Sequence, residues 1–184
     1  FAESILHPPD FSASSARAFA HALGLSILAR CHLTLLHVGT EDPGEIDWSR
    51  FPAVRKLLER WGMLPPGSHQ TDVFERLGVG IEKVALRSRR RVAATADFLK
   101  QQPRDLVVLA TAGRQGPMRW LQPSVAEGIA RWSGAKTLFV PSRATRNLID
   151  LRDGSPALHN VLIPVDHAPA PQEAVRATHR ATEL

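Results

Sequence analysis

The sequence has a single cysteine, Cys31, and no apolar run long enough to cross a membrane. One cysteine cannot form a disulfide within the chain, and the neighbouring Leu33, Leu35 and Leu36 favour a buried thiol. A membrane span needs roughly 20 consecutive apolar residues, and the first residues carry no charged and apolar leader. We therefore expect a soluble protein of the reducing cytoplasm, without a membrane partner.

The motifs of common catalytic sites are also missing. The chain contains no GxxxxGK[ST] phosphate loop, no GxSxG nucleophile turn and no HExxH zinc motif. His32 and His37 lie five residues apart on a predicted strand, so their side chains point to opposite faces and cannot share a metal ion. The sequence favours a function other than catalysis, with no catalytic residue and no metal site.

Positive charge is in excess and is mostly arginine, with 23 Lys and Arg against 18 Asp and Glu. The one dense cluster contains Arg87, Arg89, Arg90 and Arg91. It lacks the interleaved aromatic residues on which single-strand binders stack bases. A solvated surface is favoured over a contact with phosphate or with an acidic partner, so nucleic acid is not the expected partner.

Strand and helix patterns alternate along most of the chain. Runs that are apolar on both faces are typical of strands covered by helices on both sides. Residues 39–80 interrupt the simple repeat with extra helical segments. Alternation of this kind predicts a parallel sheet with helices on both faces, which binds ligands beyond the carboxyl ends of its strands. The expected strands are 5–7, 32–38, 79–86, 106–109 and 137–140, and the expected helices are 16–30, 54–61, 72–77, 92–101 and 124–133.

The stretch 105–141 organises the rest of the sequence. After the strand 106–109 the chain passes through small residues and reaches Ser124, followed three residues later by Glu127. This spacing is a capping box and predicts that a helix begins at Ser124. The free amides and the dipole of that helix start are suited to an anion.

This stretch resembles the signature of the universal stress protein family. Nucleotide-binding members carry Gly, two residues, Gly, nine residues, then Gly and Ser or Thr. The same spacing here holds Ala110, Gly113, Pro123 and Ser124. The resemblance covers residues 4–141 and implies an α/β fold, a doubly wound five-stranded parallel sheet with strand order 3-2-1-4-5. The winding then reverses between the first and fourth strands, which places a crevice there.

The resemblance also implies a nucleotide site in that crevice. The family's Asp at the end of the first strand, here Asp10, meets the adenosine, and the end of the second strand makes a backbone contact to adenine. Each assignment has a structural alternative, with Asp10 and Ser124 as helix caps and Gly113 as part of a turn. The expected nucleotide-binding residues are Pro9, Asp10, Val38, Leu109, Ala110, Gly113, Arg114, Ser124 and Val125.

Two replacements depart from the family's phosphate loop. Ala110 adds a methyl group where the nucleotide would pass, and Pro123 removes an amide donor and fixes its φ near about −65°. Arg114 and Arg119 offer compensating cations. We therefore expect weak or absent ATP binding, with AMP or an adenosine-like molecule as the alternative ligand.

The sequence begins to repeat itself near residue 160. Residues 160–167, NVLIPVDH, align with residues 4–11, SILHPPDF, so Asp166 matches Asp10. We predict a universal stress protein domain over 1–142, a linker over 143–158, and the start of a second, truncated repeat over 159–184. That start would consist of one strand and a helix over 173–182, as in a piece of a tandem protein.

The resemblance implies a regulatory or protective module with a degenerate adenine-nucleotide crevice. The main alternative is a pure interaction module that has lost its nucleotide. A nucleotide-hydrolysing enzyme and a nucleic-acid binder acting through Arg87–Arg91 are further alternatives. In the family the last strand commonly pairs two domains, so Thr137–Pro141 is the expected edge of a homodimer, or of a pseudo-dimer with the second repeat.

Overall fold

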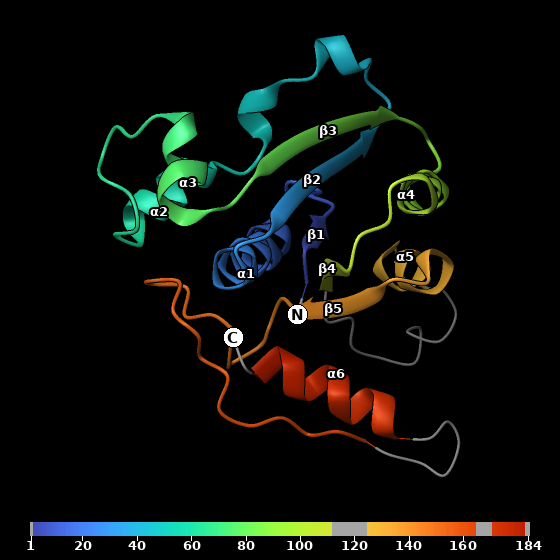
Figure 1. The fold of residues 1–184 in the computed structure, drawn as a ribbon. Helices are drawn as coiled ribbons and strands as arrows, with labels where there is room; N and C mark the ends of the chain where they lie inside the picture. Colours follow the sequence, from blue (N-terminus) through green and yellow to red (C-terminus); the bar gives the residue numbers. More distant parts are fainter. Residues whose placement is uncertain (1, 112–124, 165–170, 183–184) are drawn as a thin grey trace.

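The computed structural model describes residues 2–111, 125–164 and 171–182, and Figure 1 shows its arrangement. Five parallel strands form one sheet in the order β3-β2-β1-β4-β5, which confirms the predicted fold class and strand order. The strands are β1 (Ser4–His7), β2 (His32–Gly39), β3 (Ile81–Arg87), β4 (Leu106–Thr111) and β5 (Lys136–Pro141). The helices are α1 (Ala13–Ala29), α2 (Val54–Arg60), α3 (Gln70–Leu77), α4 (Arg91–Gln101), α5 (Val125–Ser133) and α6 (Gln172–Thr182), with short 3-10 turns η1 (Pro43–Glu45) and η2 (Trp48–Arg50).

Both faces of the sheet are buried, as the two-sided apolar strands predict. Leu33 and Leu35 of β2 point into a core shared with α1 and α2, whereas Leu36 and Val38 point into a core shared with α4 and α5. In Figure 1, α1 accordingly lies on one side of the sheet and α4 and α5 on the other. Cys31 is a free, buried cysteine, as expected, and burial raises the pKa of its thiol.

Helix α1 starts beside the end of β1, and its first turn is fixed by serine. Ser12 is the N-cap, and its side chain accepts a hydrogen bond from the amide of Ser15. At the other end Arg30 adopts a left-handed conformation with φ of 48° and closes the helix. The sequence therefore fixes the helix so that its amino end faces the carboxyl edge of the sheet.

Residues 143–158, the expected linker, pack onto the domain. Ile149 is only 1% exposed, and its Cγ2 lies 2.9 Å from where a Cβ on Gly24 of α1 would stand. The Leu148 amide donates to His21 Nε2 at 3.2 Å, and Trp61 Nε1 donates to the Leu151 carbonyl at 3.1 Å. The segment therefore adds to the core on the α1 face, and its role as a linker to a second repeat stays a prediction.

The strand expected from residue 160 is not formed over residues 160–164, which adopt neither strand nor helix; the residues that follow, 165–170, lie outside the described part. Helix α6 covers the Ala-rich segment in which a helix was expected. The start of a second repeat stays a prediction. Among the helices described, none combines the length and apolar composition that a bilayer span requires.

Candidate functional site

A cavity of about 230 Å³ opens beyond the carboxyl ends of β1, β2 and β4, where the sheet order reverses. Six of the residues predicted from the sequence line it: Pro9, Asp10, Val38, Leu109, Ala110 and Val125. The other three, Gly113, Arg114 and Ser124, fall within 112–124 and lie outside the described residues, as does Pro123. The structure thus brings together the described members of the expected site.

Asp10 supports the cap of α1 rather than serving as the cap. Its Oδ1 accepts from the Ser12 amide at 2.9 Å and from the Ser12 hydroxyl at 2.6 Å. Partial burial by itself would raise the pKa of Asp10, but these hydrogen bonds outweigh it and hold the pKa below its ordinary value. The Ser15 side chain also lowers this pKa through a hydrogen bond. The ionised carboxylate lines the cavity, where it can accept a hydrogen bond from a ligand hydroxyl.

A chain of buried hydrogen bonds anchors the loop that carries Asp10. The Asp10 amide donates to Ser15 Oγ at 3.2 Å, Ser15 Oγ lies 3.3 Å from His7 Nε2, and His7 Nδ1 lies 2.9 Å from the Val108 carbonyl. Because a carbonyl only accepts, Nδ1 carries the hydrogen and Nε2 accepts from the serine hydroxyl. Burial lowers the pKa of His7 to about 4, so the ring is neutral near pH 7.

Phe11 forms an aromatic wall of the cavity in an unusual backbone conformation. Its φ of 63° lies in the left-handed region, which a bulky residue seldom adopts. The ring stacks on His37 with centroids 4.5 Å apart and meets the edge of Phe51 at 5.5 Å. The Arg50 guanidinium lies 4.9 Å from the Phe11 centroid. These contacts offset the backbone strain and set the ring at the cavity.

The structure adds lining residues that sequence reasoning missed, chiefly Phe11, His37, Arg50 and Arg91. The sequence treated Arg91 as one of a surface cluster, but the cluster divides. All four residues are exposed, but Arg87 pairs with Asp42, and Arg91, the first residue of α4, also lines the cavity. The missed signal was topological, because Arg91 follows the carboxyl end of β3.

The site combines the Asp10 carboxylate, two arginines and an aromatic wall over a partly apolar surface. Such a set suits a ligand that carries hydroxyl groups, a flat ring and negative charge. No group of three His, Cys, Asp or Glu side chains that could hold a metal ion occurs among the residues described.

The sequence matches the universal stress protein family over residues 2–141. The chain belongs to the universal stress protein family. Among solved structures it is similar to a universal stress protein in complex with cAMP, with 18% identity and a TM-score of 0.56, over 77% of this chain and 98% of that one. It is also similar to a universal stress protein from Archaeoglobus fulgidus DSM 4304, with 14% identity and a TM-score of 0.54, over 76% of this chain and 44% of that one. At such identities the likeness concerns the fold. No curated protein matches the chain.

The family match in this universal stress protein includes the cavity but not the segment 143–158. It ends at residue 141, with β5, so the segment 143–158 that packs on α1 lies beyond the matched region. The cavity, in contrast, is lined by residues within the match. The cavity thus lies within the matched region, whereas the packed segment lies beyond it.

Proposed function

We propose that this universal stress protein is a regulatory or protective module of the cytoplasm whose cavity binds an adenine nucleotide weakly. AMP or a related adenosine ligand is the expected occupant, and ATP binds no more tightly. The observation that carries the proposal is the convergence of Asp10, Val38 and Ala110 on one cavity where the winding reverses. The cAMP complex of a protein with a similar fold adds support.

The chemistry of the lining suggests how the ligand would sit. A ribose hydroxyl donates to the Asp10 carboxylate, and the base lies against the apolar ends of β2 and β4. Arg50 and Arg91 provide positive charge for a phosphate. A cavity of about 230 Å³ lies below the roughly 300–1,000 Å³ typical of drug-sized ligands. This size favours a small nucleotide over a triphosphate, in line with the loss of an amide at Pro123.

Calorimetric titration of the purified protein tests the proposal. We expect AMP to bind with a Kd of about 10 μM to 1 mM. Asp10→Ala should weaken AMP binding by about tenfold or more, because a hydrogen bond to a charged group is lost. Asp153→Ala is the matched control, since Asp153 makes the same pair of bonds to Ser155, at 2.9 and 2.6 Å, away from the cavity.

Restoring the family's glycines provides the converse test. The double variant Ala110→Gly/Pro123→Gly should bind ATP more tightly than the natural sequence, because an amide and backbone freedom return to the loop. Submicromolar ATP binding by the natural sequence contradicts the proposal. So does AMP binding that is unchanged in Asp10→Ala.

A second candidate function, pairing of domains, is favoured by the surface at one end of the sheet. β5 is a terminal strand of the sheet order, with β4 as its neighbour. Phe139 on β5 is 40% exposed, and Trp132 on the preceding helix is 66% exposed. An edge strand bordered by exposed aromatic residues favours strand-to-strand pairing. We propose a homodimer through Thr137–Pro141, or a pseudo-dimer with a second repeat.

Sedimentation velocity measures this pairing. We expect a concentration-dependent dimer at micromolar protein, and Phe139→Lys should shift it towards monomer by placing a charge in the interface. Phe74→Lys is the control, because Phe74 is 66% exposed on α3, far along the sequence from β5. A protein that stays monomeric at about 100 μM, or a Phe74→Lys effect as large as that of Phe139→Lys, rules the proposal out.

A further inference from the structure

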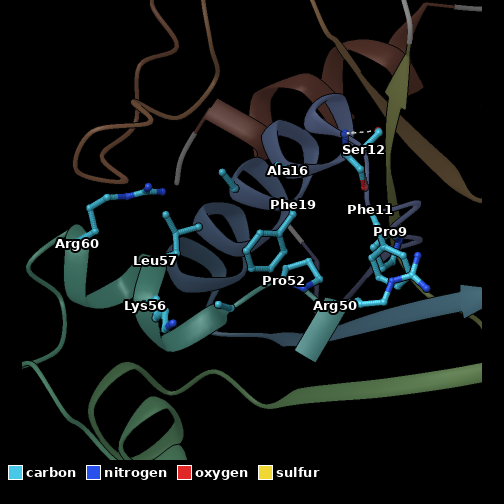
Figure 2. A pocket seen from close by; sticks show the side chains of 13 residues that line it. Pro9, Phe11, Ser12, Ala16, Phe19, Arg50, Pro52, Lys56, Leu57 and Arg60 are labelled. Atoms are coloured by element: carbon cyan, nitrogen blue, oxygen red, sulfur yellow. Dashed lines mark hydrogen bonds between the residues drawn. The ribbon is translucent and has the colours of Figure 1, made fainter. Parts of the chain in front are cut away.

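A second cavity, of about 310 Å³, lies between the amino-terminal half of α1 and the chain from η2 to α2. Figure 2 shows it from close by, with Ala16 and Phe19 of α1 on one side and Leu57 of α2 on the other. Phe19 and Leu57 are buried, at 4% and 7% exposed. The cavity therefore has an apolar floor of the kind that holds a hydrocarbon group.

The rim of the second cavity is positively charged. Arg50, Lys56 and Arg60 are its charged lining residues, and neither Asp nor Glu lines it. Lys56 and Arg60 are four residues apart on α2 and so share one side of the helix, where like charges repel. In the part of the chain that the structure describes, neither makes an ion pair or a hydrogen bond. Two cations without an ion-pair partner among the described residues thus lie beside an apolar surface, and Glu59 is the acidic residue nearest to them along the helix.

The two cavities are neighbours that share a wall. Pro9, Phe11 and Arg50 line both of them. Only the first cavity is lined by carboxylate side chains, those of Asp10 and Glu41. It also lies at the carboxyl ends of the strands. The second presents cations and hydrocarbon alone, apart from the Ser12 and Ser15 side chains of the first turn of α1. The two linings therefore suit different ligands.

We propose that the second cavity binds a small amphiphilic anion. The apolar body of the ligand lies against Phe19 and Leu57, and its carboxylate or phosphate head lies among Arg50, Lys56 and Arg60. Burying the apolar body contributes about 25 cal/mol for each Å² removed from water. The head supplies the negative charge that the rim lacks, in charge-assisted hydrogen bonds. This site shares Arg50 with the proposed nucleotide site, but Lys56 and Arg60 belong to the second cavity alone, so its test does not depend on nucleotide binding.

Calorimetry with octanoate and octyl phosphate tests the proposal, and octan-1-ol is the uncharged comparison. We expect at least one anion to bind with a Kd below about 1 mM and the alcohol to bind at least about tenfold more weakly. Whichever anion binds more tightly identifies a carboxylate or a phosphate as the preferred head. The double variant Lys56→Met/Arg60→Met, which keeps the apolar length of the side chains, should lose at least about tenfold in affinity.

Two further variants locate the ligand. Arg76→Met, which removes an exposed cation on α3, should leave the affinity unchanged. Ala16→Phe should fill the cavity and abolish binding, and because Ala16 is exposed the variant should still fold. The proposal is overturned if neither anion binds below about 1 mM or if the alcohol binds equally well. It is equally overturned if the Lys56/Arg60 double variant or Ala16→Phe retains the full affinity.

Discussion

Acidification from pH 7 to pH 4 is expected to lower the free energy of unfolding by about 3 kcal/mol through His7 alone. The pKa of His7 is lowered from 6.5 to about 4 in the folded protein, chiefly because the ring is fully buried. Between these two values the unfolded chain binds a proton that the folded protein does not. Stability is therefore complete above about pH 6.5 and is lost as the pH falls towards 4.

The same protonation should disturb the candidate site. A proton on His7 Nε2 removes the acceptor for the Ser15 hydroxyl, which in turn accepts the amide of Asp10. His21, whose pKa burial also lowers, changes stability in the same direction. Acid should thus weaken both the fold and the loop that carries the carboxylate.

Urea unfolding between pH 4 and pH 7 measures the effect. His7→Asn should be less stable at pH 7, since it leaves a gap in the core, but its stability should depend less on pH because the titrating group is gone. His159→Asn, at an exposed position, should show the same change of unfolding free energy with pH as the natural sequence. Equal slopes in His7→Asn and the natural protein would show that His7 does not carry the pH dependence.

Ile149→Ala is expected to cost about 2–5 kcal/mol of stability, which is the range for truncating a buried isoleucine. Ile149 is 1% exposed and fills the space above Gly24, where α1 has no side chain of its own. The substitution leaves a cavity between the segment 143–158 and α1. The substitution should also weaken the hydrogen bond that Trp61 Nε1 donates to the Leu151 carbonyl.

Chemical denaturation followed by tryptophan fluorescence and by circular dichroism checks this prediction. Leu162→Ala serves as the control, because Leu162 is 90% exposed and its loss should change stability by less than about 0.5 kcal/mol. Equal stabilities of the two variants would mean that the segment contributes nothing to the fold, contrary to its burial.

The strands and helices of the domain could be predicted from the sequence because their apolar patterns are strong. β2 and β4 are apolar on both faces, and α1 carries serines at its start. The order of the strands in the sheet came from the family resemblance, since periodicity does not say which parallel strands are neighbours. Asp10 and Val38 could be placed at the site once the strand order was known, because they lie at the carboxyl ends of the neighbouring strands β1 and β2.

The remainder depended on contacts that join distant parts of the chain. Phe11 and His37 meet because β1 and β2 are neighbouring strands, and Arg50 joins them because residues 39–53 fold back to the end of β1. The segment 143–158 resembles a linker in composition, and Ile149 alone gives little sign of burial. The Ile149 side chain packs on Gly24 of α1, where the helix has no side chain. The sequence alone does not reveal that these two residues are in contact.

Phe11 holds a position whose backbone geometry favours glycine, at a cost of about 1–3 kcal/mol. A glycine at this position would relax the loop, but it would remove the ring from the wall that the two cavities share. With the ring in place, Phe11 stands in the wall between the two cavities, and the Arg50 guanidinium beside it is common to both. If both proposed ligands bind, they would lie on opposite sides of one aromatic ring and beside the same guanidinium, so occupancy of one cavity would be felt in the other.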